Sequence, residues 1–339
     1  MINTASITVI GAGSYGTSLA ITLARNNHHV TLWGHKPEHI KSLQINRSNE
    51  KFLPNIKFPN NLFPIASLKT AITSSKYILI VVCSNVFTEI LHNIKPYLTQ
   101  ESRIIWATKG LEYGTGRLLQ DVVYDILGVN NPLAVISGPT FAKELASGLP
   151  TAITIAASND EFGKEIKNIF NSEKILKVCY TSDMIGVQIG GVIKNVIAIS
   201  AGISDGMGHG ANNRISLIIQ GLFEIIKLGI ALGAKKSTFM GLSGLGDLIL
   251  TCTDNQSRNR RFGILIGQGI TIENALKIIN QNIEGYSNTK EIYNLAKNMK
   301  IHMPIVEYIY QILFDNQNIQ KATDCLLKNT TKNIDAYIN

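Results

Sequence analysis

The sequence predicts an α/β domain built on a doubly wound parallel sheet, followed by an all-α domain. Over about the first 180 residues, short apolar runs rich in β-branched residues alternate with helical segments, which is typical of a parallel sheet covered on both faces. After Val187, strand-like runs nearly vanish and apolar residues recur at helical spacing. A chain of 339 residues has room for two domains, and we place them at residues 1–187 and 188–339.

The predicted strands of the first domain are short and bounded by turn residues. Several are continuous apolar runs, as expected for strands that are buried on both faces. They comprise residues 6–10, 29–33, 77–83, 103–107, 133–137 and 151–156.

The predicted helices include one near the start of the chain and a series in the second domain. In each, apolar residues recur three and four positions apart. They comprise residues 14–26, 193–203, 215–233, 271–281, 289–299, 304–315 and 319–329.

Composition narrows the class of protein. With 45% hydrophobic and 17% charged residues, the chain is expected to be globular rather than disordered. The net charge of +8 comes from lysines spread along the chain, without a basic stripe that contains aromatic residues. We therefore expect an anionic small substrate rather than a nucleic acid. The four cysteines and seven histidines show no zinc-ligand spacing, and we expect no metal site.

The sequence gives no reason to expect a membrane protein. The longest unbroken apolar run, residues 77–83, is far shorter than the ~20 residues that span a bilayer. Residues 1–6 lack the basic and apolar regions of a signal peptide. We expect a cytoplasmic protein without a membrane span.

A glycine-rich loop directly follows the first predicted strand. Gly11, Gly13 and Gly16 form G-x-G-x-x-G between this strand and a helix. In the Rossmann fold these glycines allow a tight turn, close approach to a pyrophosphate and close packing of helix on strand. The helix N-terminus then faces the phosphates. We predict dinucleotide binding; the alternative is a glycine-rich turn without a chemical role.

The end of the second predicted strand bears on the choice of cofactor. NAD-specific sites usually carry an acidic residue about 20 residues after the loop, where it binds the ribose 2′-hydroxyl. Here the chain has Gly34, His35 and Lys36 instead. Basic groups tolerate a 2′-phosphate, so the sequence favours NADP(H), alone or together with NAD(H). The alternative is that His35 and Lys36 are only exposed loop residues.

Two isolated charges occur in apolar segments of the second domain. Lys194 is the only ionisable residue between Met184 and Ser204, and Asp247 is the only charged residue between Ser237 and Thr253. A buried ammonium is costly unless it is paired or has a shifted pKa. We predict that Asp247 pairs with Lys194; the alternative is that Asp247 only caps the helix that follows it.

Three further segments carry candidate ligands for an anion. Ser257, Arg258 and Asn259 lie at the start of a predicted helix, where hydroxyl, guanidinium, amide and backbone N–H groups can bind an anion. The alternative is a solvated basic surface. Lys109 and Gly138 follow predicted strands, and ligands bind at the carboxyl ends of parallel strands. Lys109 alone is equally consistent with an ordinary loop lysine.

Taken together, these segments resemble the bacterial-type NAD(P)-dependent glycerol-3-phosphate dehydrogenases. The resemblance covers essentially the whole chain, in the order and spacing of the family. Its most specific part is the combination of K-N, G-L-G-D-L and S-R-N-R. The segments that carry it are residues 11–20, 107–112, 137–152, 190–202, 238–263 and 284–291.

The resemblance implies reversible hydride transfer between NAD(P)H and dihydroxyacetone phosphate, which gives sn-glycerol 3-phosphate for phospholipid synthesis. It also implies a homodimer, and it places the proton-transferring lysine at Lys194. The implied substrate ligands are Lys109, Gly138, Thr140, Lys194, Asp247, Ser257, Arg258 and Asn259. The implied cofactor contacts, besides the three glycines of the loop, are Ser14, Tyr15, His35, Lys109, Ala142, Arg258, Asn282 and Glu284.

The implied roles agree with the chemistry of the residues. Lys194 would protonate the C2 oxygen as general acid, Asp247 would orient Lys194, and Lys109 would polarise the developing alkoxide. Arg258 and Asn259 would hold the phosphate, so that remote binding energy orients the substrate.

The chain departs from the family pattern at three positions, and two other functions stay open. Cys83 replaces an expected proline, Gln220 an expected arginine, and Asn282 an expected apolar residue. Gln220 puts a helix or dimer contact in doubt, and Asn282 the cofactor edge. The first alternative function is an NADP-dependent 3-hydroxyacid or 2-keto acid reductase of the same architecture. The second is a non-catalytic NADP(H)-binding redox sensor.

Overall fold

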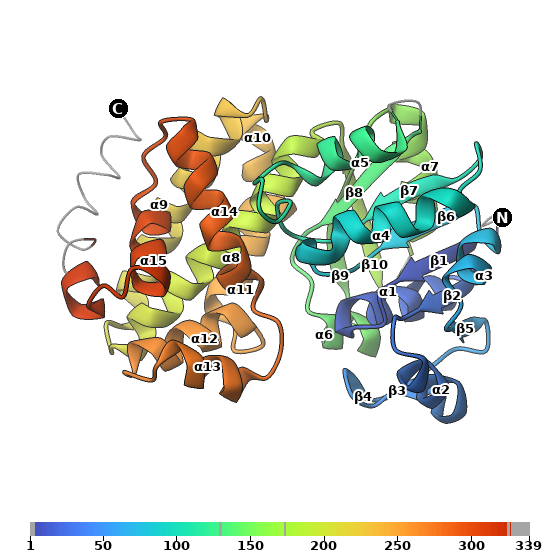
Figure 1. The fold of residues 1–339 in the computed structure, drawn as a ribbon, viewed down its shortest axis with the longest axis horizontal. Helices are drawn as coiled ribbons and strands as arrows, with labels where there is room; N and C mark the ends of the chain where they lie inside the picture. The colour runs from blue at the N-terminus through green and yellow to red at the C-terminus, as the bar shows by residue number, and fades with distance from the viewer. Residues whose placement is uncertain (1–3, 129–130, 173, 324–325, 327–339) are drawn as a thin grey trace. The chain divides into compact units, whose positions relative to one another are not determined.

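The computed structural model describes residues 4–128, 131–172, 174–323 and 326, and they form two compact units (Figure 1). The first unit contains the described residues of 1–108 and 119–184, and the second those of 109–118 and 185–339. The segment 109–118 thus belongs to the second unit, although it lies between two elements of the first. The predicted domain division at residue 187 stays a prediction; that position lies inside the helix α8 (Met184–Gly206).

The first unit contains an eight-stranded sheet in the order β10-β9-β8-β7-β6-β1-β2-β5. Six of its strands, from β8 to β5 in this order, are mutually parallel. Numbered by their occurrence in the chain, these six run 3-2-1-4-5-6, which is the Rossmann order. The predicted fold class is therefore confirmed for this unit. The six strands are β1 (Ser6–Ile10), β2 (His29–Trp33), β5 (Leu62–Ile65), β6 (Tyr77–Ile80), β7 (Arg103–Trp106) and β8 (Leu133–Ser137).

The remaining strands depart from the expected parallel sheet. The strand β9 (Thr151–Ala157) pairs antiparallel with β8, and β10 (Leu176–Thr181) then pairs parallel with β9. The connection from β8 to β9 holds only a six-residue helix, α6 (Ala142–Ser147), and an antiparallel neighbour needs no helical crossover. A separate hairpin joins β3 (Ser48–Asn49) to β4 (Leu53–Lys57).

Helices cover both faces of this sheet (Figure 1). The chain moves from β1 to β2 in one direction and from β6 to β8 in the other. Because parallel crossovers are right-handed, α1 lies on one face, and α4 and α5 lie on the other. The helices are α1 (Ser14–Arg25), α2 (Pro37–Asn46), α3 (Leu68–Thr73), α4 (Phe87–Ile94), α5 (Leu119–Leu127), α6 and α7 (Asp160–Phe170), with 3₁₀ turns at Ser84–Val86 and Lys95–Tyr97.

The regular elements in the described part of the second unit are helices, as predicted. The last predicted helix, residues 319–329, lies partly outside the described residues. The helices that follow α8 are α9 (Gly210–Ala231), α10 (Lys236–Phe239), α11 (Asp247–Thr253), α12 (Arg258–Gly267), α13 (Ile272–Ile279), α14 (Glu284–Asn298) and α15 (Pro304–Phe314), with a π-helical turn at Leu242–Gly246.

The helix α8 forms the centre of the second unit's core. Among the described helices, it alone is long and apolar enough to cross a membrane by length and composition. However, 94% of its most apolar window is buried inside the protein. This burial is that of a core helix, so its composition is explained by packing.

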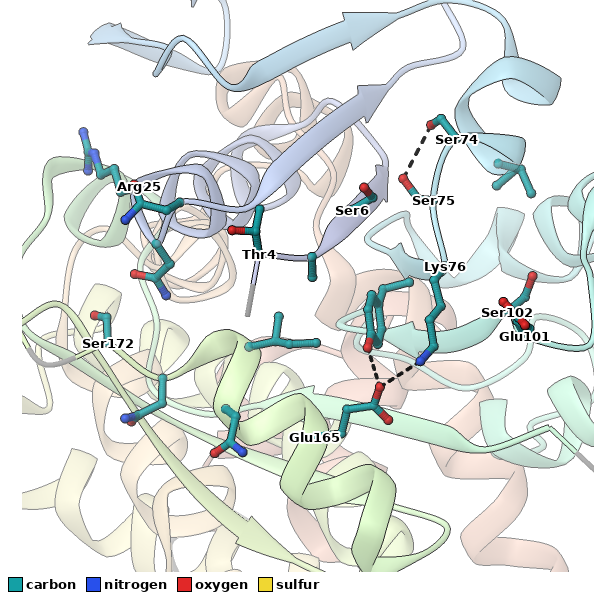
Figure 2. A pocket seen from close by; sticks show the side chains of 18 of the residues that line it. Thr4, Ser6, Arg25, Ser74, Ser75, Lys76, Glu101, Ser102, Glu165 and Ser172 are labelled. Atoms are coloured by element: carbon teal, nitrogen blue, oxygen red, sulfur yellow. Dashed lines mark hydrogen bonds and ion pairs between the residues drawn. The ribbon is translucent and has the colours of Figure 1, made fainter. Parts of the chain in front are cut away.

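A cavity of about 1400 Å³ opens at the amino-terminal edge of the sheet (Figure 2). In it, Lys76 and Tyr77 both donate to the carboxylate of Glu165. The cavity lies at the edge opposite the glycine-rich loop, which follows the carboxyl end of β1. It is therefore separate from the dinucleotide site that the sequence predicts.

Candidate active site

The glycine-rich loop adopts a conformation that requires two of its glycines. Gly11 has a φ of +121°, and a Cβ there would lie 2.1 Å from the carbonyl oxygen of Val81. A Cβ on Gly16 would lie 1.9 Å from the oxygen of Gly11. By contrast, a Cβ on Gly13 would meet nothing within 4 Å. The loop is packed tightly on one side and leaves open space at Gly13.

The N-terminus of α1 fits the phosphates of a dinucleotide. Gly13 is its N-cap, no side chain among the described residues caps it, and its first turn contains no acidic residue. Unsatisfied backbone N–H groups and the positive end of the helix dipole therefore face outward, as an anion requires. Ser14 and Tyr15 are the first two residues of the helix, and Ser14 Oγ donates to the oxygen of Phe52 (3.1 Å).

Asn49 fixes the loop from beneath. Its fully buried amide donates to the oxygen of Ala12 (3.1 Å) and to Thr17 Oγ1 (2.8 Å). Sequence reasoning missed this residue, because a single asparagine more than 30 positions from the loop carries no recognisable signal.

The other candidates of the first unit also lie at the carboxyl edge of its sheet. His35 and Lys36 follow β2 and are exposed. A Cβ on the preceding Gly34 would lie 3.0 Å from that of Ala12, so the end of β2 lies against the loop. Thr140 follows β8 and donates to the oxygen of Gly138 (3.3 Å). Ala142 begins α6.

In the second unit, one carboxylate binds two ammonium groups. Lys194, in the middle of α8, donates to Asp247 Oδ1 and to Thr251 Oγ1 (2.9 Å). Lys109 donates to the other carboxylate oxygen of Asp247 (2.8 Å). Lys194 is 6% exposed and Asp247 is 1% exposed. The predicted pairing of Lys194 and Asp247 is thus present, and Lys109 joins it.

Local packing brings Asp247 to Lys194. Gly190 lies one turn before Lys194, and a Cβ there would lie 2.3 Å from the oxygen of Ser243. The missing side chain lets α8 contact the π-helical turn that leads directly into Asp247. Gly246, rather than Asp247, is the N-cap of α11. The carboxylate of Asp247 therefore pairs with the two lysines and does not cap the helix.

Burial and charge shift the pKa values of this cluster in opposite directions. Burial lowers the pKa of Lys194 most, Asp247 raises it and the nearby Lys109 ammonium lowers it; together they bring it from 10.5 to about 8. Burial alone would raise the pKa of Asp247, but the two ammonium groups hold it below its usual range. Lys194 can therefore gain or lose a proton near neutral pH, while Asp247 stays ionised.

A second polar network adjoins Lys194 in sequence. Asn195 donates to Glu284 Oε2 (3.2 Å) and accepts from Asn259 Nδ2 (3.0 Å). The backbone N–H of Gly285 donates to Asn259 Oδ1 (2.9 Å). This network joins α8, α12 and the start of α14, and places the candidates Asn259 and Glu284 beside each other. Asn282 lies two residues before α14 and is exposed.

The structure distinguishes the arginines at the start of α12. Ser257 is the N-cap, and its Oγ accepts from the backbone N–H of Arg260 (3.2 Å). Arg260 is held in an ion pair with Asp205 (2.6 Å). Arg258 makes no hydrogen bond or ion pair with any residue that the structure describes, and Arg261 is exposed. Arg258 is therefore a half-buried cation beside the positive end of a ten-residue helix.

Comparisons with known proteins agree with these observations. Profiles described as the N-terminus and the C-terminus of NAD-dependent glycerol-3-phosphate dehydrogenase match residues 6–163 and 183–324. The chain belongs to this family. The resemblance that the sequence predicted is therefore confirmed, and the chain is also similar to proteins named glycerol-3-phosphate dehydrogenase [NAD(P)+]. The chain is 63% identical to one from Bartonella quintana (strain Toulouse) over 98% of this chain and 97% of the relative.

Two further proteins match this chain over nearly its full length. A glycerol-3-phosphate dehydrogenase [NAD(P)+] from Photorhabdus laumondii subsp. laumondii is 60% identical over 98% of each chain. The crystal structure of glycerol-3-phosphate dehydrogenase from Coxiella burnetii superposes with a TM-score of 0.93 at 43% identity, and the match covers 96% of this chain and 99% of that one. The chain thus has the fold of an NAD(P)-dependent glycerol-3-phosphate dehydrogenase.

Proposed function

We propose that the chain is an NAD(P)-dependent glycerol-3-phosphate dehydrogenase that reversibly reduces dihydroxyacetone phosphate to sn-glycerol 3-phosphate. The observation that carries this proposal is the buried cluster in which Asp247 binds both Lys194 and Lys109. The chain belongs to a family whose members carry this name. The same unit holds Arg258 at a helix N-terminus, without a hydrogen-bond or ion-pair partner among the described residues.

The proton transfer can be assigned to Lys194. When bound, the nicotinamide ring supplies the hydride to C2 of the substrate. Lys194 donates a proton from its ammonium to the C2 oxygen and is left neutral, then regains a proton from water. A pKa near 8 suits this cycle, because neither form of the lysine is rare near neutral pH. In the reverse direction the neutral amine takes the proton back.

Asp247, Lys109 and Thr251 keep the proton donor in place. Two of the three N–H groups of the Lys194 ammonium donate to Asp247 and Thr251. The third proton is available for a substrate oxygen. Lys109 stabilises the negative charge that develops on this oxygen. The cluster is thereby ordered before the reaction begins.

We assign the substrate phosphate to the first turn of α12. Arg258 supplies a guanidinium that can bind two phosphate oxygens, and the first turn of the helix supplies backbone N–H groups. Ser257 and Asn259 add polar groups on either side. From the first unit, Gly138 and Thr140 are the further proposed ligands.

For the cofactor, the uncapped α1 and the open space at Gly13 support binding of the pyrophosphate. The exposed His35 favours NADP(H), alone or together with NAD(H). The other proposed contacts are Ser14, Tyr15, Lys109, Ala142, Arg258, Asn282 and Glu284. Residues 1–187 would then form the dinucleotide-binding domain, and residues 188–339 the catalytic domain.

We further propose that the enzyme acts in the cytoplasm as a homodimer and supplies sn-glycerol 3-phosphate for glycerophospholipid synthesis. These assignments rest on the family resemblance alone. Size-exclusion chromatography with light scattering tests the dimer directly, and a monomer in solution would refute that part.

A spectrophotometric assay tests the activity. We expect oxidation of NADPH and NADH on addition of dihydroxyacetone phosphate, measured in parallel. Lys194→Ala should abolish turnover while NADPH still binds, and Lys277→Ala, at an exposed position of α13, should not. Arg258→Ala should chiefly raise the KM for the phosphorylated substrate, whereas Arg261→Ala should leave it unchanged.

The same assay tests the two alternative functions, a keto acid reductase and a redox sensor. Faster turnover of a non-phosphorylated 2-keto acid than of dihydroxyacetone phosphate would support a keto acid reductase. Cofactor binding without any turnover would support a redox sensor. Activity retained by Lys194→Ala would refute the general-acid assignment while leaving the overall reaction intact.

A further inference from the structure

A largely enclosed carboxylate, Asp205, lies on α8, three turns after Lys194. Asp205 Oδ2 accepts from Arg260 Nη2 (2.6 Å) and Nε (3.1 Å). Arg214 Nη1 donates to both oxygens of the same carboxylate (2.8 and 2.9 Å). The side chain of Asp205 is only 10% exposed. The proposed mechanism assigns no role to this carboxylate.

The helices α8 and α12 meet backbone to backbone beside Asp205. Two glycines of α8, Gly202 and Gly206, lie against two glycines of α12, Gly263 and Gly267. A Cβ added to any of these four would lie only 2.1 to 2.3 Å from a backbone oxygen of the other helix. The Cβ of residue 202 would meet the oxygen of Arg260. No side chain can separate the helices along this line, so their distance is fixed by the backbones themselves.

These contacts fasten the first turn of α12 to α8 at three points. The side chain of Arg260 is held by Asp205, its carbonyl lies against Gly202, and the neighbouring Asn259 is bound by Asn195. Arg258 lies in the same turn and has no partner among the described residues. The position of the Arg258 side chain therefore depends on the position of the helix turn that carries it.

We propose that Asp205 is a positioning residue for the substrate phosphate. By holding Arg260, Asp205 fixes the first turn of α12 and so directs Arg258 and Asn259 at the phosphate, without touching the substrate itself. Arg214 also donates to Asp205 and so keeps its carboxylate in place if Arg260 moves. This inference rests on the proposed function, because it assumes that Arg258 binds the phosphate.

Charge and position predict opposite effects when Asp205 is changed to asparagine. The substitution removes a negative charge near an anion site, and by electrostatics alone it would lower the KM for a phosphorylated substrate. It also weakens the two hydrogen bonds from Arg260, because a neutral amide accepts less strongly than a carboxylate. If positioning dominates, the KM rises instead.

The experiment measures Asp205→Asn with dihydroxyacetone phosphate, with dihydroxyacetone and with inorganic phosphate as inhibitor. We expect the KM for dihydroxyacetone phosphate and the Ki of inorganic phosphate to rise together by about tenfold. The turnover of dihydroxyacetone and the Kd of NADPH should change by less than about twofold. An unchanged or lower KM would overturn the proposal, as would an equal loss of kcat/KM on both substrates.

Two further variants keep the test decisive if Asp205→Asn folds poorly. Arg260→Lys keeps the charge but loses the paired contacts of the guanidinium, and it should raise the same KM and Ki. Arg261→Gln removes a charge from the exposed side of α12 and should change neither. Thermal melts of every variant set the assay temperature below the transition. A wild-type protein without activity would refute the proposed function, whereas an active wild type with an unaffected Asp205→Asn and Arg260→Lys would refute only the positioning role.

Discussion

The substitution Asp247→Asn tests the electrostatics of the catalytic cluster. It keeps the size of the side chain and removes the one negative charge that Lys194 and Lys109 share. The burial of Lys194 is unchanged, and so is the repulsion from Lys109. Both of these lower the pKa of Lys194, and Asp247 is what opposes them. The pKa of Lys194 must therefore fall in the variant.

The size of the fall follows from the charges. Two unit charges about 4 Å apart interact by about 4 kcal/mol at an effective dielectric constant of about 20. One pKa unit corresponds to about 1.4 kcal/mol, so this interaction corresponds to about three units. We expect a fall of about one to three units, from the value of about 8 in the native enzyme.

The pH dependence of kcat/KM for ketone reduction measures this shift. The general acid must be protonated, so the native enzyme should lose activity as the pH rises through about 8. In Asp247→Asn the same basic limb should lie at least one unit lower, and the two enzymes should differ less at pH 6 than at pH 8. For oxidation of sn-glycerol 3-phosphate the neutral amine is needed, so the corresponding limb rises with pH.

Asp254→Asn provides the control. Asp254 lies in the same segment, and its carboxylate accepts from the backbone N–H of Gln256 (2.7 Å) rather than from a lysine. Its variant should keep the native pH profile. A basic limb that stays in place or moves upward in Asp247→Asn would refute the reasoning, because the carboxylate would then not be what holds the proton on Lys194.

Two predictions concern stability. Burial raises the pKa of Glu224 from 4.5 to about 8, although the backbone N–H groups of Ile305 and Val306 donate to it; native stability should therefore fall between pH 4.5 and about 8 and then level off. Glu224→Gln should lose the part of the pH dependence of urea unfolding that Glu224 contributes, and should be up to about 3 kcal/mol more stable at pH 7, because each pH unit between 4.5 and 7 costs the buried carboxyl group ~1.4 kcal/mol. An equal pH dependence in both proteins would contradict this. Gly202→Ala should lose about 1–3 kcal/mol by overpacking, whereas Gly241→Ala, whose Cβ would meet only one atom at 3.4 Å, should lose little; equal losses would contradict the close contact of α8 and α12.

The sequence predicts the core of the fold because its strands are continuous apolar runs. It does not predict that β9 runs antiparallel to β8, since a buried strand has the same composition in either direction. The edge strand β5 was missed for a different reason. It contains Pro64, which interrupts the pattern of a strand and is tolerated only at an edge.

The site is predictable where a residue is exceptional in its own segment. Lys194 and Asp247 are single charges in apolar surroundings, so each indicates a buried partner. Thr251 and Asn195 are ordinary polar residues in helices, and only the fold shows that they bind members of the cluster. The sequence predicts an anion site at the start of α12 from Ser257, Arg258 and Asn259, but it does not show that Arg260 is held elsewhere. The partner of Arg260 is Asp205, which lies more than 50 positions away in the sequence.

Burial and the ratio of charges together explain why Lys194 can act as an acid. A carboxylate that faced one ammonium would raise the pKa of that lysine and make it a weak proton donor. Here burial lowers the pKa of Lys194, Asp247 is shared between two ammonium groups, and the charge of Lys109 lowers the pKa of Lys194 as well. The cluster is then paired well enough to be buried, yet it keeps one excess positive charge, which suits an anionic substrate and a developing alkoxide. The position of Lys109 is thus part of the acid chemistry of Lys194, and not only a further substrate contact.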